Sequence, residues 1–477
     1  MSTAAGSWRA DARRIGALAW PVFVGQVSVL AFGTIDTILA ARHSPGDLAA
    51  LAVGSAAYIT IFVGFMSLVL ALGPITGQLY GAGQLPQAGR QLHQGVWVAL
   101  GASLLGSLLL AFPQHFLAAS QASDEVAGKI RGYLLALACS LPASLLFTVY
   151  RGFNTAVSRP KAVMLLQIGG LVLKLPLSVA LVFGVPVLGV PALGVVGCGI
   201  ATGIVMWAQA AVAWVVLRRD PFYAPFAVFG RGLDAPDRRM LAAHLRLGLP
   251  MGATTLVEVS GFTFMAIFIA RLGTEAVAGH QIAVNLVVLL FMVPMSLANA
   301  AGTLVAQRIG ARDAADAWRL AWHGAGLTLA LALLCGTLVA LLRVPLVGLY
   351  TTNAAVAAAA LPLLAWVAVF HLADATQTYA GVLLRAWRIA TVTFVVNATA
   401  MWGVGLAGGY VLAFGLWPGG TPSGLQGAPG FWAAATAGLV IAAVALGGVL
   451  AWVLRRFAGE ATRARTSSAP PLPVADR

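Results

Sequence analysis

Twelve apolar runs, each long enough to cross a lipid bilayer, follow one another along this chain of 477 residues. About 20 apolar residues span the hydrocarbon core as an α-helix, because a helix satisfies its own backbone hydrogen bonds. Only 9% of the residues are charged, which is too few to cover soluble domains. We therefore predict an all-α membrane protein of twelve transmembrane helices. The expected spans are 14–41, 48–80, 93–112, 126–150, 162–184, 193–217, 240–270, 277–307, 319–342, 355–384, 389–415 and 431–454.

Basic residues are distributed unevenly between the two sides of this layout. Most of the 29 Lys and Arg residues fall in the two terminal segments and in every second loop. Such an excess is typical of the cytoplasmic side of a membrane protein. We therefore expect a multi-pass protein of the bacterial inner membrane with both termini in the cytoplasm. The opposite side of the membrane has only Arg42, Lys129, Arg131, Arg271 and Arg343.

Composition and motifs exclude several functional classes. The net charge of +14 comes from short clusters between apolar runs, which is typical of topology signals rather than of a nucleic-acid-binding face. The three cysteines form neither a disulfide framework nor a CxxC metal site. The sequence contains no Walker A loop and no HExxH motif. We expect neither an enzyme nor an ATP-driven pump, and no cofactor besides a coupling ion.

The two halves of the chain repeat each other. Because the linker follows six helices, both halves enter the membrane from the same side, and such parallel repeats enclose a substrate pathway at their interface. The expected organisation is a cytoplasmic segment 1–13, a six-helix lobe 14–217, a linker 218–239, a second six-helix lobe 240–457 and a disordered tail 458–477. An offset of 229 residues aligns Pro21 with Pro250, Arg42 with Arg271, Gly73 with Gly302, Gln78 with Gln307 and Gly81 with Gly310.

Four ionisable residues stand out within the predicted spans, and two of them lie in the first half. A charge there costs roughly 2.5–3.5 kcal/mol on insertion, so each is a functional candidate. We interpret Asp36 as a proton-binding site that forms an ion pair with Lys174 and releases it on protonation. The alternatives are a structural carboxylate bonded by Thr34 or Thr37, and a lysine that extends to the membrane interface. Lys174 and Ser178 are therefore candidate modulators.

The other two charges, Glu258 and Asp374, lie in the second half. Neither has a basic residue one helical turn away, so no local ion pair explains them. Two carboxylates that face one interior can bind Na⁺ as hard oxygen ligands or share a proton. We predict that they bind the coupling cation, with a structural role as the alternative. His371, three residues before Asp374, is a candidate modulator of this site.

Side chains of the second half are candidates for a substrate cavity. Methionine and aromatic side chains adapt to varied apolar ligands, although core packing explains any one of them equally well. A membrane histidine commonly makes a helix–helix hydrogen bond instead. The candidates are Phe264, Met265, His280, Gln281, Asn285, Phe291 and Met292.

Motifs along nearly the whole chain resemble the multidrug and toxic compound extrusion (MATE) family, particularly its NorM-like bacterial branch. In the first half they are GTIDTILAA around Asp36, ALGPITGQLYGAG at 71–83 and GVVGCGIATGIVMW at 194–207. In the second half they are LVEVSGF around Glu258, AGHQIAVN at 278–285, FMVPMS at 291–296 and LADATQ around Asp374.

The resemblance implies two six-helix lobes that open alternately to each side of the membrane and export drugs against Na⁺ or H⁺ entry. By position, Asp36 matches the family's first-lobe carboxylate, and Glu258 and Asp374 match its second-lobe carboxylates. Two departures matter. Lys174 stands where relatives commonly have asparagine, which puts proton handling by Asp36 in doubt, and Phe370 stands where some have tyrosine, which weakens the argument for Na⁺ at Asp374.

The function expected from these observations is monomeric secondary antiport of cationic amphiphilic compounds. One alternative uses the same fold to flip or export a lipid-linked or anionic metabolite, but such a cavity should be rich in cations and only Lys174 fits. The other alternative is a membrane-embedded enzyme such as a prenyl transferase. It would need clustered metal-binding carboxylates, whereas the acids here are widely separated.

Overall fold

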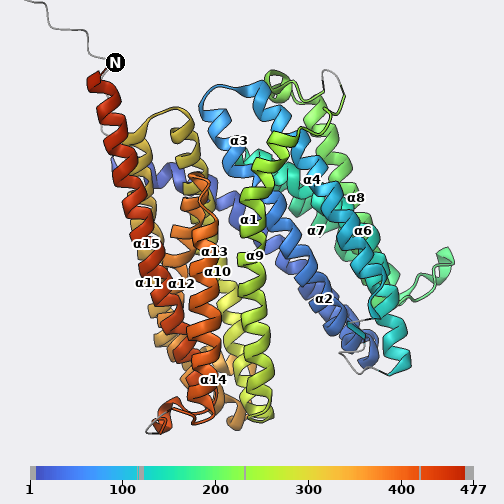
Figure 1. Ribbon diagram of the computed structural model, residues 1–477. Coiled ribbons are helices and arrows are strands. Elements are labelled where there is room, and N and C mark those ends of the chain that lie inside the picture. The colour runs from blue at the N-terminus through green and yellow to red at the C-terminus, as the bar shows by residue number, and fades with distance from the viewer. Residues whose placement is uncertain (1–6, 115, 118–122, 230–231, 418–419, 468–477) are drawn as a thin grey trace, which may run out of the picture.

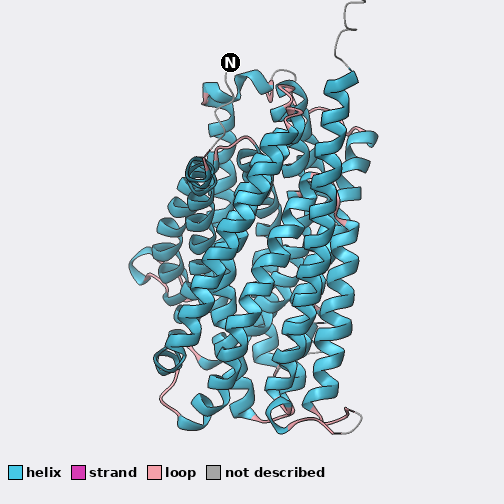
Figure 2. Cartoon of the chain, turned by 90° about the vertical axis from the view of Figure 1, so that its left-hand side faces the viewer, coloured by secondary structure: helices cyan, strands magenta, loops and turns pink. Residues whose placement is uncertain are grey.

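The computed structural model describes residues 7–114, 116–117, 123–229, 232–417 and 420–467, and helices make up nearly all of this part of the chain (Figure 2). Twelve helical spans within it are long and apolar enough to cross a membrane. Each of them overlaps one of the twelve spans expected from the sequence. The predicted all-α membrane fold is therefore confirmed.

Within the described ranges, the six spans of the first half comprise seven α-helices, because the second span is divided in two. Pro74 has no N–H to donate to the carbonyl of Leu70 and its ring crowds that carbonyl, so the span breaks at Ala71. The helices are α1 (Trp8–His43), α2 (Pro45–Leu70), α3 (Leu72–Gly81), α4 (Leu85–Ala111), α6 (Asp124–Ala156), α7 (Pro160–Phe183) and α8 (Val195–Arg219).

The second half differs from the expectation at its eleventh and twelfth spans. The eleventh contains a nine-residue π-helix, η3, which the sequence analysis did not predict. The twelfth continues as helix to Ser467, well beyond position 457, because no proline interrupts it before Pro470. The helices are α9 (Arg238–Ala270), α10 (Thr274–Gly310), α11 (Ala314–Tyr350), α12 (Ala354–Ala386), α13 (Thr391–Ala398), η3 (Thr399–Ala407), α14 (Gly408–Ala413) and α15 (Ala428–Ser467).

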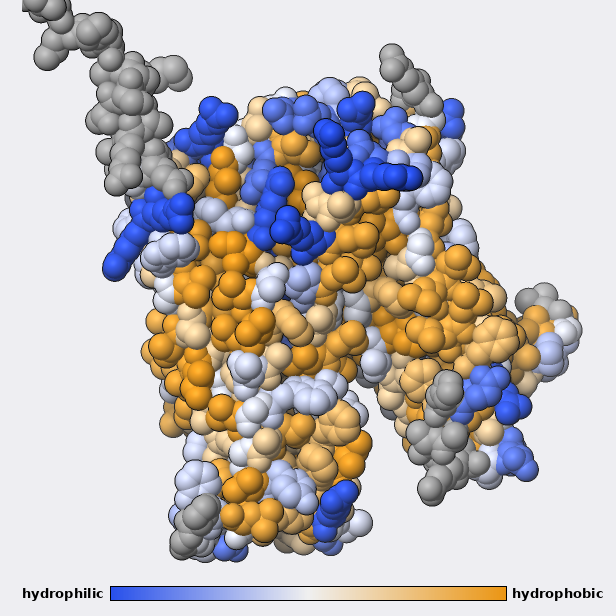
Figure 3. Space-filling view, in the orientation of Figure 1, coloured by the Kyte–Doolittle hydropathy of each residue, from blue (hydrophilic) through white to orange (hydrophobic). Residues whose placement is uncertain are grey.

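The helices form two bundles that diverge toward one end of the molecule (Figure 1). Buried side chains of the first half, from Leu39 to Val228, make one apolar core, and those of the second half make two others. The space-filling view shows a hollow between the bundles that opens at the end opposite the main group of hydrophilic residues (Figure 3). We call the hydrophilic end, where the bundles meet, the closed end.

Helix α1 joins the bundles at the closed end. Ile15 and Ala19 of α1 belong to an apolar core of the second half. The buried Asp11 carboxylate accepts from Arg319 Nε at 2.9 Å and lies 2.8 Å from His323 Nδ1, and both partners are on α11. The start of α1 is therefore held by the second bundle, although the rest of α1 packs on α7.

The segment predicted as a linker packs against the first bundle. Its 3₁₀ helix η2 (Pro221–Phe226) buries Tyr223, whose hydroxyl donates to Asn154 Oδ1 at 2.6 Å. Asp220 forms an ion pair with Arg159 at 2.6 Å. The backbone N–H of Phe222 and the Arg159 guanidinium hold the pKa of the Asp220 carboxyl below its ordinary value. The first part of this segment is therefore an ordered cap on the first bundle.

Candidate functional site

Asp36 of α1 and Lys174 of α7 form a buried ion pair in the first bundle. Lys174 Nζ lies 2.9 Å from Asp36 Oδ1 and donates to Thr202 Oγ1 of α8 at 2.7 Å. The lysine is completely buried, and its ammonium lies 5.4 Å from the centroid of the Phe32 ring. Three helices thus converge on one ammonium. Lys174 pairs with Asp36 instead of extending to a membrane interface.

The two hydroxyls expected to bond Asp36 if it were a structural carboxylate bond other groups. Thr34 and Thr37 donate to carbonyls of their own helix, those of Leu30 at 3.4 Å and Gly33 at 2.8 Å, rather than to the carboxylate. Ser178 lies one turn after Lys174 on α7 and is completely buried. Its Oγ has no hydrogen-bond partner within the described part of the chain.

Glu258 and Asp374 come together in the second bundle from α9 and α12. Asp374 is 7% exposed, and its Oδ1 accepts from Gln377 Nε2 at 3.2 Å. Glu258 is half-buried and accepts from Asn397 Nδ2 of α13 at 3.2 Å. The two carboxylates are close enough for their charges to interact. Neither forms an ion pair within 4.0 Å among the residues that the structure describes, in contrast to Asp36.

Arg385 is a charged residue near the Glu258 and Asp374 carboxylates that the sequence did not predict to lie there. The expected span ended at position 384, which placed Arg385 in a loop, whereas α12 continues to Ala386. Its charge interacts with that of Glu258 without an ion pair, and its Nε is buried without a partner in the described ranges. Leu384 and Ala386, the residues on either side of Arg385, are both buried. The apolar run that precedes Arg385 was the available signal.

Phe370 and His371, the neighbours of Asp374 noted in the sequence, lie on the same helix as Asp374, α12. Phe370 belongs to an aromatic group, with ring centroids 6.0 Å from Phe262 and 5.5 Å from Trp432. His371 is 2% exposed, and no described residue bonds its Nε2. Phe370 therefore contributes no oxygen to the carboxylate site.

The predicted cavity residues on α10 face different directions, because consecutive helix positions are about 100° apart. His280 is buried, with its ring 5.9 Å from Trp432. Gln281 and Asn285 are exposed, and Asn285 Oδ1 accepts from a hydroxyl of α11, that of Tyr350, at 3.0 Å. Phe291 and Met292 are half-buried.

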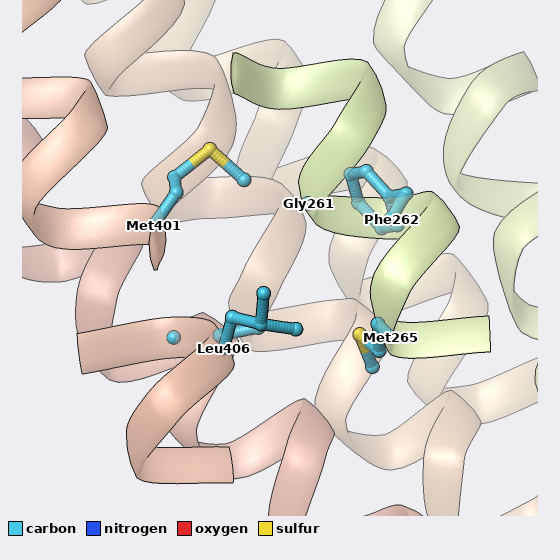
Figure 4. Close-up of a pocket in the computed structure, with 7 residues that line it drawn as sticks. Gly261, Phe262, Met265, Met401 and Leu406 are labelled. Carbon is cyan, nitrogen blue, oxygen red and sulfur yellow. The ribbon is translucent and has the colours of Figure 1, made fainter. Parts of the chain in front are cut away.

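The two predicted cavity residues on α9 differ in the same way. Phe264 is 39% exposed and lies edge-on to Trp402, with ring centroids 5.6 Å apart. Met265 is 4% exposed and borders a narrow apolar pocket between α9, η3 and α15 (Figure 4). The pocket is lined by Gly261, Phe262, Met265, Met401, Gly405, Leu406 and Ala435. Only Met265 of the seven predicted cavity residues lines this pocket.

A pair of equivalent contacts closes the hydrophilic end, and we call them the glutamine latch. Gln78 Nε2 of α3 donates to the carbonyl of Ala386 at 2.6 Å, and Gln307 Nε2 of α10 donates to the carbonyl of Ala156 at 2.7 Å. Each bond joins a glutamine of one bundle to the last residue of a helix of the other bundle, α12 or α6. Two glycines permit the approach, since a Cβ at Gly81 would lie 1.8 Å from the Gln307 carbonyl oxygen, and one at Gly310 would lie 1.9 Å from that of Gln78.

Comparison with known proteins shows relatives over most of the chain. A family model described as MatE matches residues 21–180 and 250–411. A probable multidrug resistance protein NorM from Aromatoleum aromaticum is 40% identical over 395 residues, which cover 82% of this chain and 84% of that protein. Multidrug resistance protein PmpM from Pseudomonas aeruginosa is 34% identical over 406 residues, 84% of each chain.

Solved structures of low sequence identity share the fold. The eukaryotic MATE transporter AtDTX14 has a TM-score of 0.83 at 19% identity, covering 96% of this chain and 99% of its own. An outward-facing conformation of a multidrug resistance MATE family transporter also has a TM-score of 0.83, at 17% identity, with 94% and 96% covered.

Proposed function

The chain belongs to the MatE family, whose members include multidrug efflux transporters, and from this membership and its buried charges we propose that it is a secondary antiporter. It exports cationic, amphiphilic compounds across the inner membrane against entry of Na⁺ or H⁺. The family resemblance read from the motifs is confirmed by these relatives. The coupling ion, the substrate class and the transport cycle are the proposed parts.

The observation that carries the proposal is the contrast in charge compensation. Two carboxylates, Glu258 and Asp374, lie inside the second bundle without an ion pair among the described residues. Removing an ionised carboxylate from water is unfavourable unless a cation or a proton compensates its charge. A coupling ion that binds there would neutralise the site and would be released where water hydrates the carboxylates again.

The hollow between the bundles supports alternating access. Its open end exposes the inner helices on one side, and the glutamine latch with its glycine contacts holds the other end together (Figure 3). Movement of the bundles as rigid bodies would break the latch while the cores of the bundles stay intact. Substrate would then reach the interface from the hydrophilic end.

Efflux of a fluorescent cationic dye from proteoliposomes tests this proposal. Na⁺ and proton gradients are imposed separately on the wild type, Asp36→Asn and Glu258→Gln. Thr263→Val is the control on α9, since its exposed hydroxyl bonds only the carbonyl of Val259. We expect one gradient to drive efflux, and Glu258→Gln to lose it while the control retains it.

The same assay contains the result that would reject antiport of cations. Wild-type protein of correct fold that moves no dye under either gradient would contradict the proposal. Anionic or lipid-linked compounds would then be the substrates to test, with Lys174 as their anchor, since it is a buried cation of the first bundle.

A further inference from the structure

A buried amide on α13 points at the second-bundle carboxylates. Asn397 is 1% exposed, and its Nδ2 donates to Glu258 Oε1 at 3.2 Å. Its Oδ1 is also buried and accepts no hydrogen bond from any described residue. A buried acceptor left without a donor is unfavourable, because it has lost its hydrogen bonds to water. The amide nitrogen of Asn397 is therefore bonded, whereas its oxygen is available to a ligand.

A second free oxygen lies one turn earlier on the same helix face. Thr393 is 2% exposed, and its Oγ1 likewise has no partner in the part of the chain that is described. Its methyl group lies 3.2 Å from the position that a Cβ at Gly381 of α12 would take. The start of α13, one turn before Asn397, therefore lies beside the helix that carries Asp374.

The π-helix fixes this arrangement against α9. Trp402 of η3 donates from Nε1 to the carbonyl of Val257 at 3.2 Å, next to Glu258 in the chain. Asn397, which lies just before η3, bonds the Glu258 side chain itself. The segment that contains the π-helix is thus attached to α9 at two adjacent residues. Short π-helical stretches recur at functional sites of helical proteins.

We propose that Asn397 is a ligand of Na⁺ as the coupling cation, which it binds through Oδ1 together with the carboxylates of Glu258 and Asp374. This inference rests on the proposed antiport function. When Glu258 is ionised and no metal is bound, Nδ2 donates to it. When Na⁺ binds, the amide rotates by 180° and presents Oδ1, since an asparagine amide carries a donor and an acceptor at equivalent positions.

The chemistry of the surrounding atoms favours a metal cation over a proton. A proton on one carboxyl provides a single donor, whereas Asn397 Oδ1 and Thr393 Oγ1 are both buried without a donor. Hard oxygen ligands that receive no hydrogen bond suit a cation such as Na⁺. Phe370 supplies no oxygen, because its side chain is a hydrocarbon whose ring packs on Trp432. Asn397 therefore provides a neutral oxygen ligand, which Phe370 on the helix of Asp374 does not.

Sodium binding to the purified full-length protein tests the assignment without relying on transport. Thermal unfolding in detergent is followed as Na⁺ replaces K⁺ at constant ionic strength. The variants are Asn397→Leu, which is nearly isosteric, Asn397→Asp, which retains oxygen ligands, and Glu258→Gln. Thr399→Val is the control, because its exposed hydroxyl bonds only carbonyls of its own helix segment.

We expect saturable stabilisation of the wild type and of Thr399→Val by Na⁺, and none of Glu258→Gln. Asn397→Leu should lose at least about tenfold in Na⁺ affinity, since even outer-shell partners of metal sites contribute this much. Asn397→Asp should bind Na⁺ at least as tightly as the wild type. If Asn397 acted only as an Nδ2 donor that orients Glu258, Asn397→Asp would lose affinity, and that result would overturn the assignment.

Two further outcomes also contradict the assignment. One is an unchanged Na⁺ affinity in folded Asn397→Leu, and the other is the absence of any Na⁺ effect in the wild type. Dye efflux driven by a proton gradient in the latter case would leave the proposed antiport standing while this inference fails. Absence of efflux under both gradients would reject the antiport itself.

Discussion

The two bundles share a framework and a latch but differ in how they neutralise their buried carboxylates. In the first, Asp36 lies 2.9 Å from the ammonium of Lys174. In the second, Glu258 and Asp374 have amide donors but no described ion-pair partner, and Arg385 is only near enough to interact with Glu258 at longer range. A repeated fold therefore allows one lobe to carry its own counter-ion while the carboxylates of the other have none among the described residues.

This difference has a direct energetic consequence. A buried ion pair recovers its desolvation cost only with close geometry and further hydrogen bonds, and Lys174 has both, through Asp36 and Thr202. Glu258 and Asp374 lack such a partner, so their ionised forms are disfavoured in the absence of a cation. We infer that the first site supports the structure while the second responds to ions.

The largest expected effect separates the two sites by stability. Asp36→Asn leaves the Lys174 ammonium buried and unpaired, so it should destabilise the protein by about 3–5 kcal/mol. Glu258→Gln removes a charge that no close cation compensates and should not destabilise it in Na⁺-free buffer. Chemical unfolding in detergent measures both changes.

The double variant Asp36→Asn/Lys174→Met serves as the control for that comparison. Because both charges are absent, it should recover most of the stability lost by Asp36→Asn alone. Equal destabilisation by Asp36→Asn and Glu258→Gln would show that the two sites do not differ in the way described.

A smaller effect should appear in both bundles, and it should be larger for Gln307, whose Nε2 also donates to Ser158 Oγ at 2.8 Å. Gln78→Leu and Gln307→Leu each remove cross-bundle hydrogen bonding, which contributes about 1 kcal/mol per bond and corresponds to roughly a fivefold shift in population. Each variant should therefore favour separation at the closed end. Distances between spin labels at the exposed positions Gln84 and Arg312 measure this separation.

The latch glycines provide a stronger version of the same test. Gly81→Ala and Gly310→Ala would each place a methyl group within 2 Å of a backbone carbonyl of the other bundle, so both should increase the label distance more than the glutamine variants. Gly83→Ala is not a suitable control, because Gly83 has a φ of +72°, whereas Gly73 has open space at its Cβ and no positive φ. Gly73→Ala should leave the distance unchanged.

The smallest effect concerns the cap that packs only on the first bundle. Asp220→Asn removes the partly exposed ion pair with Arg159 and should cost about 0.2–1 kcal/mol. Because the folded-state pKa of Asp220 is lowered, its contribution is present at neutral pH and disappears as the pH falls through that pKa. Unfolding at pH 7 and at pH 3 should show a smaller difference between wild type and Asp220→Asn at pH 3 than at pH 7.

The sequence was sufficient to predict the residues that bear charge inside the membrane, but not all of their partners. Asp36, Lys174, Glu258 and Asp374 stand out because ionisable residues are rare in apolar spans. Asn397 and Arg385 did not stand out, since a single amide is unremarkable in a span and the expected span ended one residue before Arg385. Their significance depends on α9, α12 and α13 meeting at one point.

By itself, the sequence determined the number of helices, their apolar character and the division into two similar halves, because these follow from local hydropathy and from an offset between equivalent positions. Only the tertiary structure decided which charges are paired, where the π-helix lies and how the glutamines cross between bundles. Those features depend on contacts between residues such as Gln78 and Ala386, which lie 308 positions apart in the chain. Local hydropathy carries no information about such distances, because it is the packing of helices against each other that sets them.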